Sequence, residues 1–236
     1  MHIGLITLFP ELFEPFLRLS FVGKAIAQGR VQVFTENLRD HGIGVHKSVD
    51  DTPYGGGSGM VMRVDCLTAA MERAQERSPV PLRRILLTPQ GRPFRQPVAR
   101  ELTSYPGVLL VCGRYEGFDE RTRQFVDDEL SLGDFVMTGG EVAAMAMIEA
   151  SVRLLPGVLG NHESVAEESF SESLEGMLEY PQYTRPAEFR GLAVPEVLKG
   201  GDHAKVAAWR RQEAWERTQA RRPELVPNAD QDPRRQ

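Results

Sequence analysis

Three glycine-bearing stretches each follow a run of residues that favours a β-strand. They are Pro89-Gln90-Gly91, Gly113-Arg114-Tyr115-Glu116-Gly117, and Gly133-Asp134 continuing to Thr138-Gly139-Gly140-Glu141. In a parallel sheet, the loops after the carboxyl ends of the strands gather at one edge, and ligands bind there. Glycine lets the backbone approach a ligand closely and leaves its N–H and C=O groups bare. Tight turns or helix caps explain any single loop equally well, but three together predict a binding site.

A fourth glycine-rich stretch, 54–60, is flexible enough to cradle a phosphate group. It lacks the Lys-Ser/Thr pair of a P-loop, and no G-x-G-x-x-G motif opens a helix after the first expected strand. These two absences argue against a nucleoside triphosphatase and against a Rossmann cofactor domain. Asp50 and Asp51 precede the stretch. Adjacent acids usually form a solvated turn, so metal ligation is the minority interpretation.

The elements that must hold these loops are predicted by alternating patterns. Short β-branched runs occur at 3–7, 31–35, 85–88 and 108–112, and segments of helical period separate them. This alternation predicts an α/β layer with a mostly parallel sheet. One helix is expected around residues 64–74. Another is expected at 141–154, where an apolar stripe is formed by Val142, Met145, Ile148 and Val152.

Composition sets the class of protein. The 236 residues include 28 Lys+Arg against 33 Asp+Glu and are 41% hydrophobic, which is typical of a globular protein with a real core. Two cysteines, Cys66 and Cys112, cannot form a disulfide framework or a zinc cluster, and their apolar neighbours indicate buried thiols in a reducing compartment. No stretch is apolar enough to cross a bilayer and none resembles a signal peptide. We therefore expect a cytoplasmic protein with no membrane association.

The charge pattern divides the last third of the chain. Residues 160–176 contain several glutamates and no Lys or Arg, which favours a linker. The segment from His203 to Arg222 is strongly basic and predicts a positively charged surface. Residues 227–236 are expected to fray.

Seven motifs carry a resemblance to a known family, in an unchanged order from Met1 to about Leu225. They are Leu8-Phe9-Pro10-Glu11-Leu12-Phe13, Val49-Asp50-Asp51-Thr52-Pro53-Tyr54-Gly55-Gly56-Gly57, Cys112-Gly113-Arg114-Tyr115-Glu116-Gly117, Gly133-Asp134-Phe135, Gly139-Gly140-Glu141, Pro156-Gly157-Val158-Leu159-Gly160 and Tyr183-Thr184-Arg185-Pro186. With these motifs the sequence resembles the bacterial tRNA (guanine-N1)-methyltransferases, the TrmD family of the SPOUT class.

The resemblance implies a reaction and an architecture. The reaction is methyl transfer from S-adenosylmethionine to N1 of the guanine at tRNA position 37, and the resemblance leaves a role for Mg²⁺ open. The architecture is a homodimer of chains with a deep trefoil knot in the parallel sheet, whereas topology rules alone predict an unknotted sheet. The expected domains are a knotted methyltransferase domain at 1–159, a linker at 160–176 and a small helical tRNA-binding domain at 177–236.

The same resemblance assigns site residues. The expected cofactor pocket comprises Leu87, Thr88, Pro89, Gly113, Tyr115, Glu116, Gly117, Leu132, Gly133, Phe135, Met137, Gly139 and Gly140. Arg153 is expected to stabilise charge on the guanine, and a carboxylate before Ser-Phe is expected to take the N1 proton. The family has aspartate there and this chain has Glu168, with Glu167 as a competing neighbour.

Recognition of tRNA is expected from Lys199 and the arginines after His203, including Arg210 and Arg211, with His46 and Arg114 seating the target nucleotide. Two rival functions stay open. A related knotted methyltransferase with another RNA target would share the glycine loops but lack the context of Tyr183-Thr184-Arg185-Pro186 and Glu168-Ser169-Phe170. A non-catalytic RNA-binding module would need the basic segment but not the loops.

Overall fold

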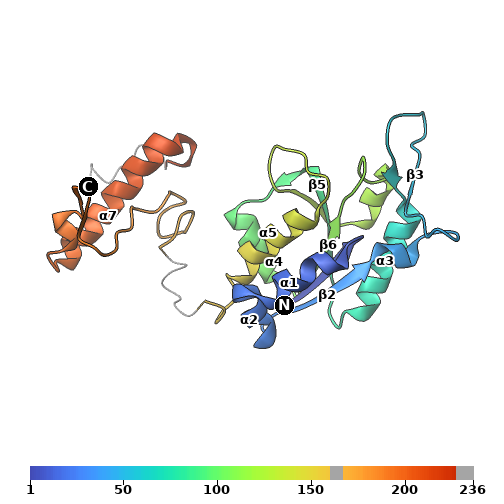
Figure 1. Ribbon diagram of the computed structural model, residues 1–236, viewed down its shortest axis with the longest axis horizontal. Coiled ribbons are helices and arrows are strands. Elements are labelled where there is room, and N and C mark those ends of the chain that lie inside the picture. Colours follow the sequence, from blue (N-terminus) through green and yellow to red (C-terminus); the bar gives the residue numbers. More distant parts are fainter. Residues whose placement is uncertain (160–166, 227–236) are drawn as a thin grey trace. The chain divides into compact units, whose positions relative to one another are not determined.

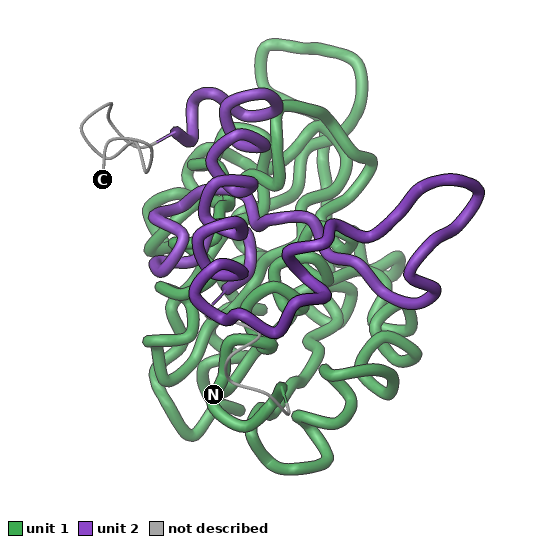
Figure 2. Tube along the Cα trace, turned by 90° about the vertical axis from the view of Figure 1, so that its left-hand side faces the viewer, with its two compact units in different colours: residues 1–160 green, residues 161–236 purple. Residues whose placement is uncertain are grey.

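The chain divides into two compact units in the computed structural model, which describes residues 1–159 and 167–226. Unit 1 is Met1–Gly160 and unit 2 is Asn161–Gln236 (Figure 2).

A five-stranded sheet forms the centre of unit 1 (Figure 1). Its strands, in spatial order β2-β1-β6-β5-β7, are β2 (Gln32–Asn37), β1 (His2–Thr7), β6 (Gly107–Cys112), β5 (Arg83–Pro93) and β7 (Asp128–Ser131). Every neighbouring pair in this sheet is parallel. The expected α/β fold with a parallel sheet is therefore confirmed.

Helices cover both faces of this sheet (Figure 1), and strands β1, β2, β5 and β6 supply side chains to both. Ile3 and Leu5 belong to one apolar cluster, whereas Ile6 belongs to the other, because successive side chains of a strand point to opposite faces. The first cluster is covered by α1 (Phe13–Arg18), α2 (Ser20–Ala27), α4 (Gln96–Ser104) and α5 (Glu141–Val152), and the second by α3 (Val64–Arg77). Short 3₁₀ helices lie at Pro10–Leu12, Leu38–His41 and Glu120–Phe125.

The buried face of α5 differs from the predicted stripe. Val142 is 61% exposed, and the buried residues of the helix are Glu141, Ala143, Ala144, Met147, Ile148, Ser151 and Val152. The prediction was wrong for Val142, whereas Ile148 and Val152 are buried and Met145 packs against the core, because the helix is apolar on nearly all sides. Its sequence therefore does not distinguish the face that contacts the sheet from the face that is exposed.

β5 is longer than the predicted 85–88 run because it is interrupted and then resumes. Its register against β7 shifts between Leu87 and Arg92, so the residues between them leave the ladder. Gly91 lies against the backbone of β7, where an added Cβ would be 2.5 Å from the amide nitrogen of Leu130. Glycine is therefore required for the strand to rejoin its partner.

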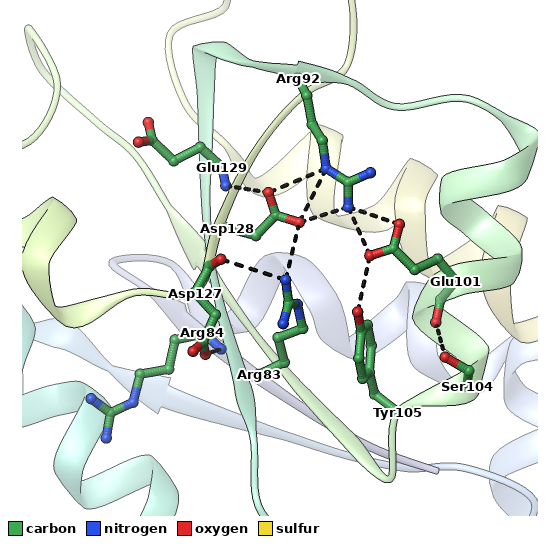
Figure 3. A network of polar contacts seen from close by, with 9 residues as sticks. All are labelled: Arg83, Arg84, Arg92, Glu101, Ser104, Tyr105, Asp127, Asp128 and Glu129. Atoms are coloured by element: carbon green, nitrogen blue, oxygen red, sulfur yellow. Dashed lines mark hydrogen bonds and ion pairs between the residues drawn. The ribbon is translucent and has the colours of Figure 1, made fainter.

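A polar network holds the second half of β5 (Figure 3). Arg92 Nη2 lies 2.6 Å from Asp128 Oδ2 and 2.9 Å from Glu101 Oε1, and the Tyr105 hydroxyl donates to Glu101 at 3.0 Å. Burial alone would raise the pKa of Asp128, but hydrogen bonds from Arg92 and from the Glu129 amide outweigh it and hold that pKa below its usual value. The network joins β5, β7 and α4.

The predicted burial of both cysteines is confirmed. Cys66 and Cys112 are both buried, and burial raises the pKa of the Cys112 thiol well above its usual value. The stretch 54–60 connects β3 (Asp50–Asp51) to β4 (Val61–Met62), which pair in antiparallel fashion.

Unit 2 contains one long helix among its described residues, α7 (His203–Arg221), with a hairpin of β8 (Glu188–Phe189) and β9 (Leu192–Ala193) and 3₁₀ turns at Glu196–Leu198 and Pro223–Leu225. Part of the predicted linker, 160–176, belongs to unit 2. Residues 160–166 lie outside the described residues, but Phe170 donates its amide to the Met177 carbonyl at 2.8 Å and Ser171 is buried. The described part of that segment, 167–176, thus folds with unit 2.

Candidate active site

A cavity of about 360 Å³ opens beside the interruption in β5 and the carboxyl ends of β6 and β7. All thirteen residues expected to form the cofactor pocket line it: Leu87, Thr88, Pro89, Gly113, Tyr115, Glu116, Gly117, Leu132, Gly133, Phe135, Met137, Gly139 and Gly140. Three loops that are distant in sequence therefore form one concave wall. Its volume falls within the range of pockets for small organic ligands, about 300–1,000 Å³.

The loop after β6 forms the middle of this wall. Tyr115 has a φ of 58°, a left-handed conformation that is uncommon for a non-glycine residue. Burial and the nearby Asp50 carboxylate raise the pKa of its hydroxyl. The loop is held to the 54–60 stretch because the Glu116 amide donates to the Met60 carbonyl at 3.0 Å. Gly59 (φ +89°) lies against Glu116, whose Oε1 would be 2.5 Å from an added Cβ.

The segment 132–140 closes the other side. The Gly140 amide donates to the Gly113 carbonyl at 2.9 Å, and Arg114 pairs with Gly139 in an antiparallel bridge. An added Cβ on Gly140 would be 2.9 Å from both the Cys112 Cα and the Gly113 nitrogen. The two loops are therefore in backbone contact, which only a residue without a side chain allows at this position.

The comparison with known proteins gives one consistent result. The family model described as tRNA (Guanine-1)-methyltransferase TrmD matches residues 1–228. The chain belongs to the TrmD family. A match of this length favours neither of the two rival functions. These were a related methyltransferase with another RNA target and a non-catalytic RNA-binding module.

Three curated relatives support the same conclusion, and each is named tRNA (guanine-N(1)-)-methyltransferase. The protein of Sorangium cellulosum is 59% identical, with 95% of this chain and 93% of the relative covered. A Thermus thermophilus protein is 54% identical over 97% of this chain and 93% of the relative. A Geobacter sulfurreducens protein is 51% identical over 98% of this chain and 93% of the relative.

Some residues that line the cavity in this TrmD-family chain were not predicted: Gln90, Phe118, Glu120, Arg123, Leu130, Ser131, Val136, Thr138 and Ala143. Arg123 donates to Gln90 Oε1 at 2.6 Å and forms ion pairs with Glu120 and Glu129. Gln90 belongs to the first glycine-bearing stretch, which gave a signal that it is close to a ligand. Arg123 gave no such signal, because its place depends on the contact between a 3₁₀ turn and β7.

The two residues expected to act on guanine belong to different units. Arg153 caps the C-terminus of α5 in unit 1 and is partly buried. Glu168 is in unit 2. Its neighbour Glu167 accepts a hydrogen bond from the Tyr180 hydroxyl at 2.7 Å. Arg210 Nη1 lies 3.6 Å from Glu167 Oε2. Burial and that bond raise the pKa of Tyr180. The Glu167 carboxylate thus has a structural task within unit 2.

The residues expected to contact tRNA have different surroundings. Arg211 and His46 are exposed, and exposed Lys199 forms an ion pair with Glu196 at 2.7 Å. Arg210 is only partly exposed and its guanidinium lies 4.6 Å from the centre of the Tyr180 ring. Arg114 lines the cavity, but its guanidinium is bound by groups of the protein itself, described below.

Within 1–159 and 167–226, no group of three or more His, Cys, Asp or Glu side chains is arranged to hold a metal ion. Among the same residues, no helix is long and apolar enough to cross a membrane.

Proposed function

We propose that this TrmD-family chain transfers a methyl group from S-adenosylmethionine to N1 of the guanine at position 37 of tRNA. The observation that supports this most directly is the gathering of all thirteen expected pocket residues around one cavity at the carboxyl edge of the sheet. The whole-chain family match supplies the reaction and the substrate class.

The cavity has the properties that S-adenosylmethionine requires. Leu87, Leu132 and Met137 provide apolar surface for an adenine ring, and the glycines around them leave backbone N–H and C=O groups for hydrogen bonds. The Glu116 carboxylate lines the same cavity and can offset the positive charge of a sulfonium. The bound cofactor supplies the methyl group.

The side chains of the chain itself must make the guanine nucleophilic. Neutral guanine carries a proton on N1, and negative charge develops toward O6 as that proton leaves. We assign proton removal to Glu168 and stabilisation of the O6 charge to the Arg153 guanidinium. A carboxylate is a weak base for the N1 proton, so the position of the Glu168 carboxylate must make it effective. We favour Glu168 over Glu167 because Glu168 directly precedes Ser169-Phe170, the position at which the family has aspartate.

The basic surface of unit 2 is proposed to hold the phosphates of the tRNA. Lys199 and Arg211 are exposed and fit this role, which requires cations accessible to solvent. His46, at a turn of unit 1 where the Lys47 amide donates to the Gly44 carbonyl, is proposed to approach the target nucleotide.

Three further properties complete the proposal. We propose that the chain forms a trefoil knot at the loop after β6 and the segment 132–140, which the hydrogen bond between Gly140 and Gly113 connects. We also propose a homodimer, because Phe135, Val136 and Val142 expose apolar surface beside the cavity, where a second copy can cover it. A cytoplasmic location is proposed because tRNA is the substrate.

The experiment that tests the function uses labelled S-adenosylmethionine and two tRNA transcripts that differ only in whether guanine occupies position 37. Label should enter only the transcript that has this guanine, and equal labelling of both would refute the substrate. Glu168→Gln should lower the single-turnover methylation rate by about 10²- to 10⁴-fold with little change in cofactor affinity. If Glu167→Gln causes that loss of rate and Glu168→Gln does not, the general base is Glu167.

A further inference from the structure

Glu141 is a buried carboxylate at the first position of α5, with only 2% of the residue exposed. Its Oε1 accepts a hydrogen bond from the Thr7 hydroxyl at 2.9 Å, and its Oε2 lies 2.8 Å from Arg114 Nη2. Removing such an ion pair from water costs several kcal/mol per ion, and a well-packed apolar pair is often at least as stable. Stability alone therefore does not explain a glutamate at this position.

The partner of this carboxylate reaches the wall of the cavity. Arg114 Nη1 donates to the Thr138 carbonyl at 3.3 Å, and the guanidinium lies 4.5 Å from the centre of the Phe9 ring. Its backbone pairs with Gly139. An added Cβ on Gly139 would clash with the Arg114 guanidinium and would be 2.6 Å from Glu141 Oε2. The ion pair therefore occupies the space directly behind the 132–140 segment.

We propose that Glu141 is a positioning residue for the cofactor cavity, a proposal that rests on the function proposed above. Glu141 orients Arg114, and Arg114 holds the Thr138 carbonyl, which sets the position of the segment 132–140 against the loop after β6. Thr7, at the end of β1, fixes the other carboxylate oxygen. The guanidinium of Arg114 is thereby used within the protein, and we reassign it from seating the target nucleotide to shaping the cavity.

Breaking the ion pair between Glu141 and Arg114 should have two separable effects, one on stability and one on cofactor affinity. Glu141→Gln keeps the size of the side chain but leaves the partly buried Arg114 cation without its counter-charge, which should lower both the melting temperature and cofactor affinity. Adding Arg114→Gln removes the uncompensated charge, so the melting temperature should recover in part. Cofactor affinity should not recover, because the Thr138 carbonyl still lacks its donor.

A matched control exists on another part of unit 1. Glu36 is also buried, accepts a hydrogen bond from His41 at 2.8 Å and forms an ion pair with Arg77. Neither Glu36 nor Arg77 lines the cavity. Glu36→Gln should therefore lower the melting temperature while leaving cofactor affinity unchanged.

The test is calorimetric titration of the full chain with S-adenosylmethionine, without tRNA, alongside thermal unfolding. Glu141→Gln should weaken binding by about 10- to 100-fold, the equivalent of one lost charge-assisted hydrogen bond. In a methylation assay with tRNA and saturating cofactor, the Glu141→Gln protein should regain most of its turnover. Its KM for the cofactor should therefore rise more than its kcat falls. Wild-type affinity in Glu141→Gln, or affinity that recovers together with the melting temperature in the double variant, would overturn the proposal. Failure of the wild-type chain to bind the cofactor would instead overturn the proposed function and this inference with it.

Discussion

Adding one methyl group at Gly140 should damage the site by separating two parts of the protein that are in contact. Gly140 has a φ of −81°, so alanine fits its backbone conformation and space alone decides the outcome. The new Cβ would be 2.9 Å from the Cys112 Cα, where carbon atoms normally stay about 3.5–4.0 Å apart. β6 and α5 are both buried in the core, so neither can move without disturbing other contacts.

The magnitude of this effect follows from overpacking, which typically costs about 1–3 kcal/mol in a well-packed core. For a unit of this size, each kcal/mol corresponds to about 2–4 °C, so Gly140→Ala should lower the melting temperature of unit 1 by about 2–12 °C. Because Gly140 also lines the cavity, we expect weaker binding of S-adenosylmethionine as well.

The assay combines differential scanning calorimetry with cofactor titration. Gly200→Ala is the matched control, because Gly200 does not have a positive φ and its added Cβ would meet only the Glu196 carbonyl at 4.0 Å. This control should behave as the wild type in both measurements. A Gly140→Ala protein with unchanged melting temperature and unchanged affinity would show that the contact with Cys112 can relax freely, and would refute the reasoning.

Three other predictions concern the polar contacts of both units. Asp128→Asn weakens the charge-assisted hydrogen bonds to the partly exposed Arg92, which contribute about 1.5 kcal/mol. It should therefore lower the melting temperature of unit 1 by about 3–6 °C. Because the pKa of Asp128 is depressed, this contribution is complete above about pH 4, the ordinary carboxyl pKa, and is lost as pH falls through the folded value. The difference between wild type and variant should therefore shrink in acid, and a difference that grows there would contradict the assignment. Thr218→Val leaves the Leu178 amide without its 3.0 Å acceptor and should destabilise unit 2 by about 1–3 kcal/mol, seen as faster hydrogen exchange in α7 but not in β6. Arg211→Glu should weaken tRNA binding and reduce its salt dependence by about one counterion, with no change in the melting temperature; an unchanged salt slope would exclude a phosphate contact.

Local patterns predicted four of the five strands of the central sheet and the loops that carry most of the cavity wall, but not β7 or Arg123. Strand runs such as 108–112 consist of consecutive apolar residues because both faces of a parallel sheet are buried, and such runs can be recognised without knowing the fold. The glycine-bearing stretches were recognisable because they follow those runs. The family motifs then named the pocket residues position by position.

Only the tertiary structure decided which partners the functional side chains have. The Thr7 hydroxyl and the Glu141 carboxylate are 134 positions apart in sequence, and nothing in the residues around either one indicates the hydrogen bond between them. The same is true of the buried face of α5 and of the interruption in β5, which depend on neighbouring elements rather than on local propensity. Sequence by itself determined four of the five strands of the sheet, the glycine loops and the family. The packing of distant segments decided that Glu167 binds Tyr180 and that Arg114 binds the buried Glu141 carboxylate, because charged groups take their positions from the groups that compensate them.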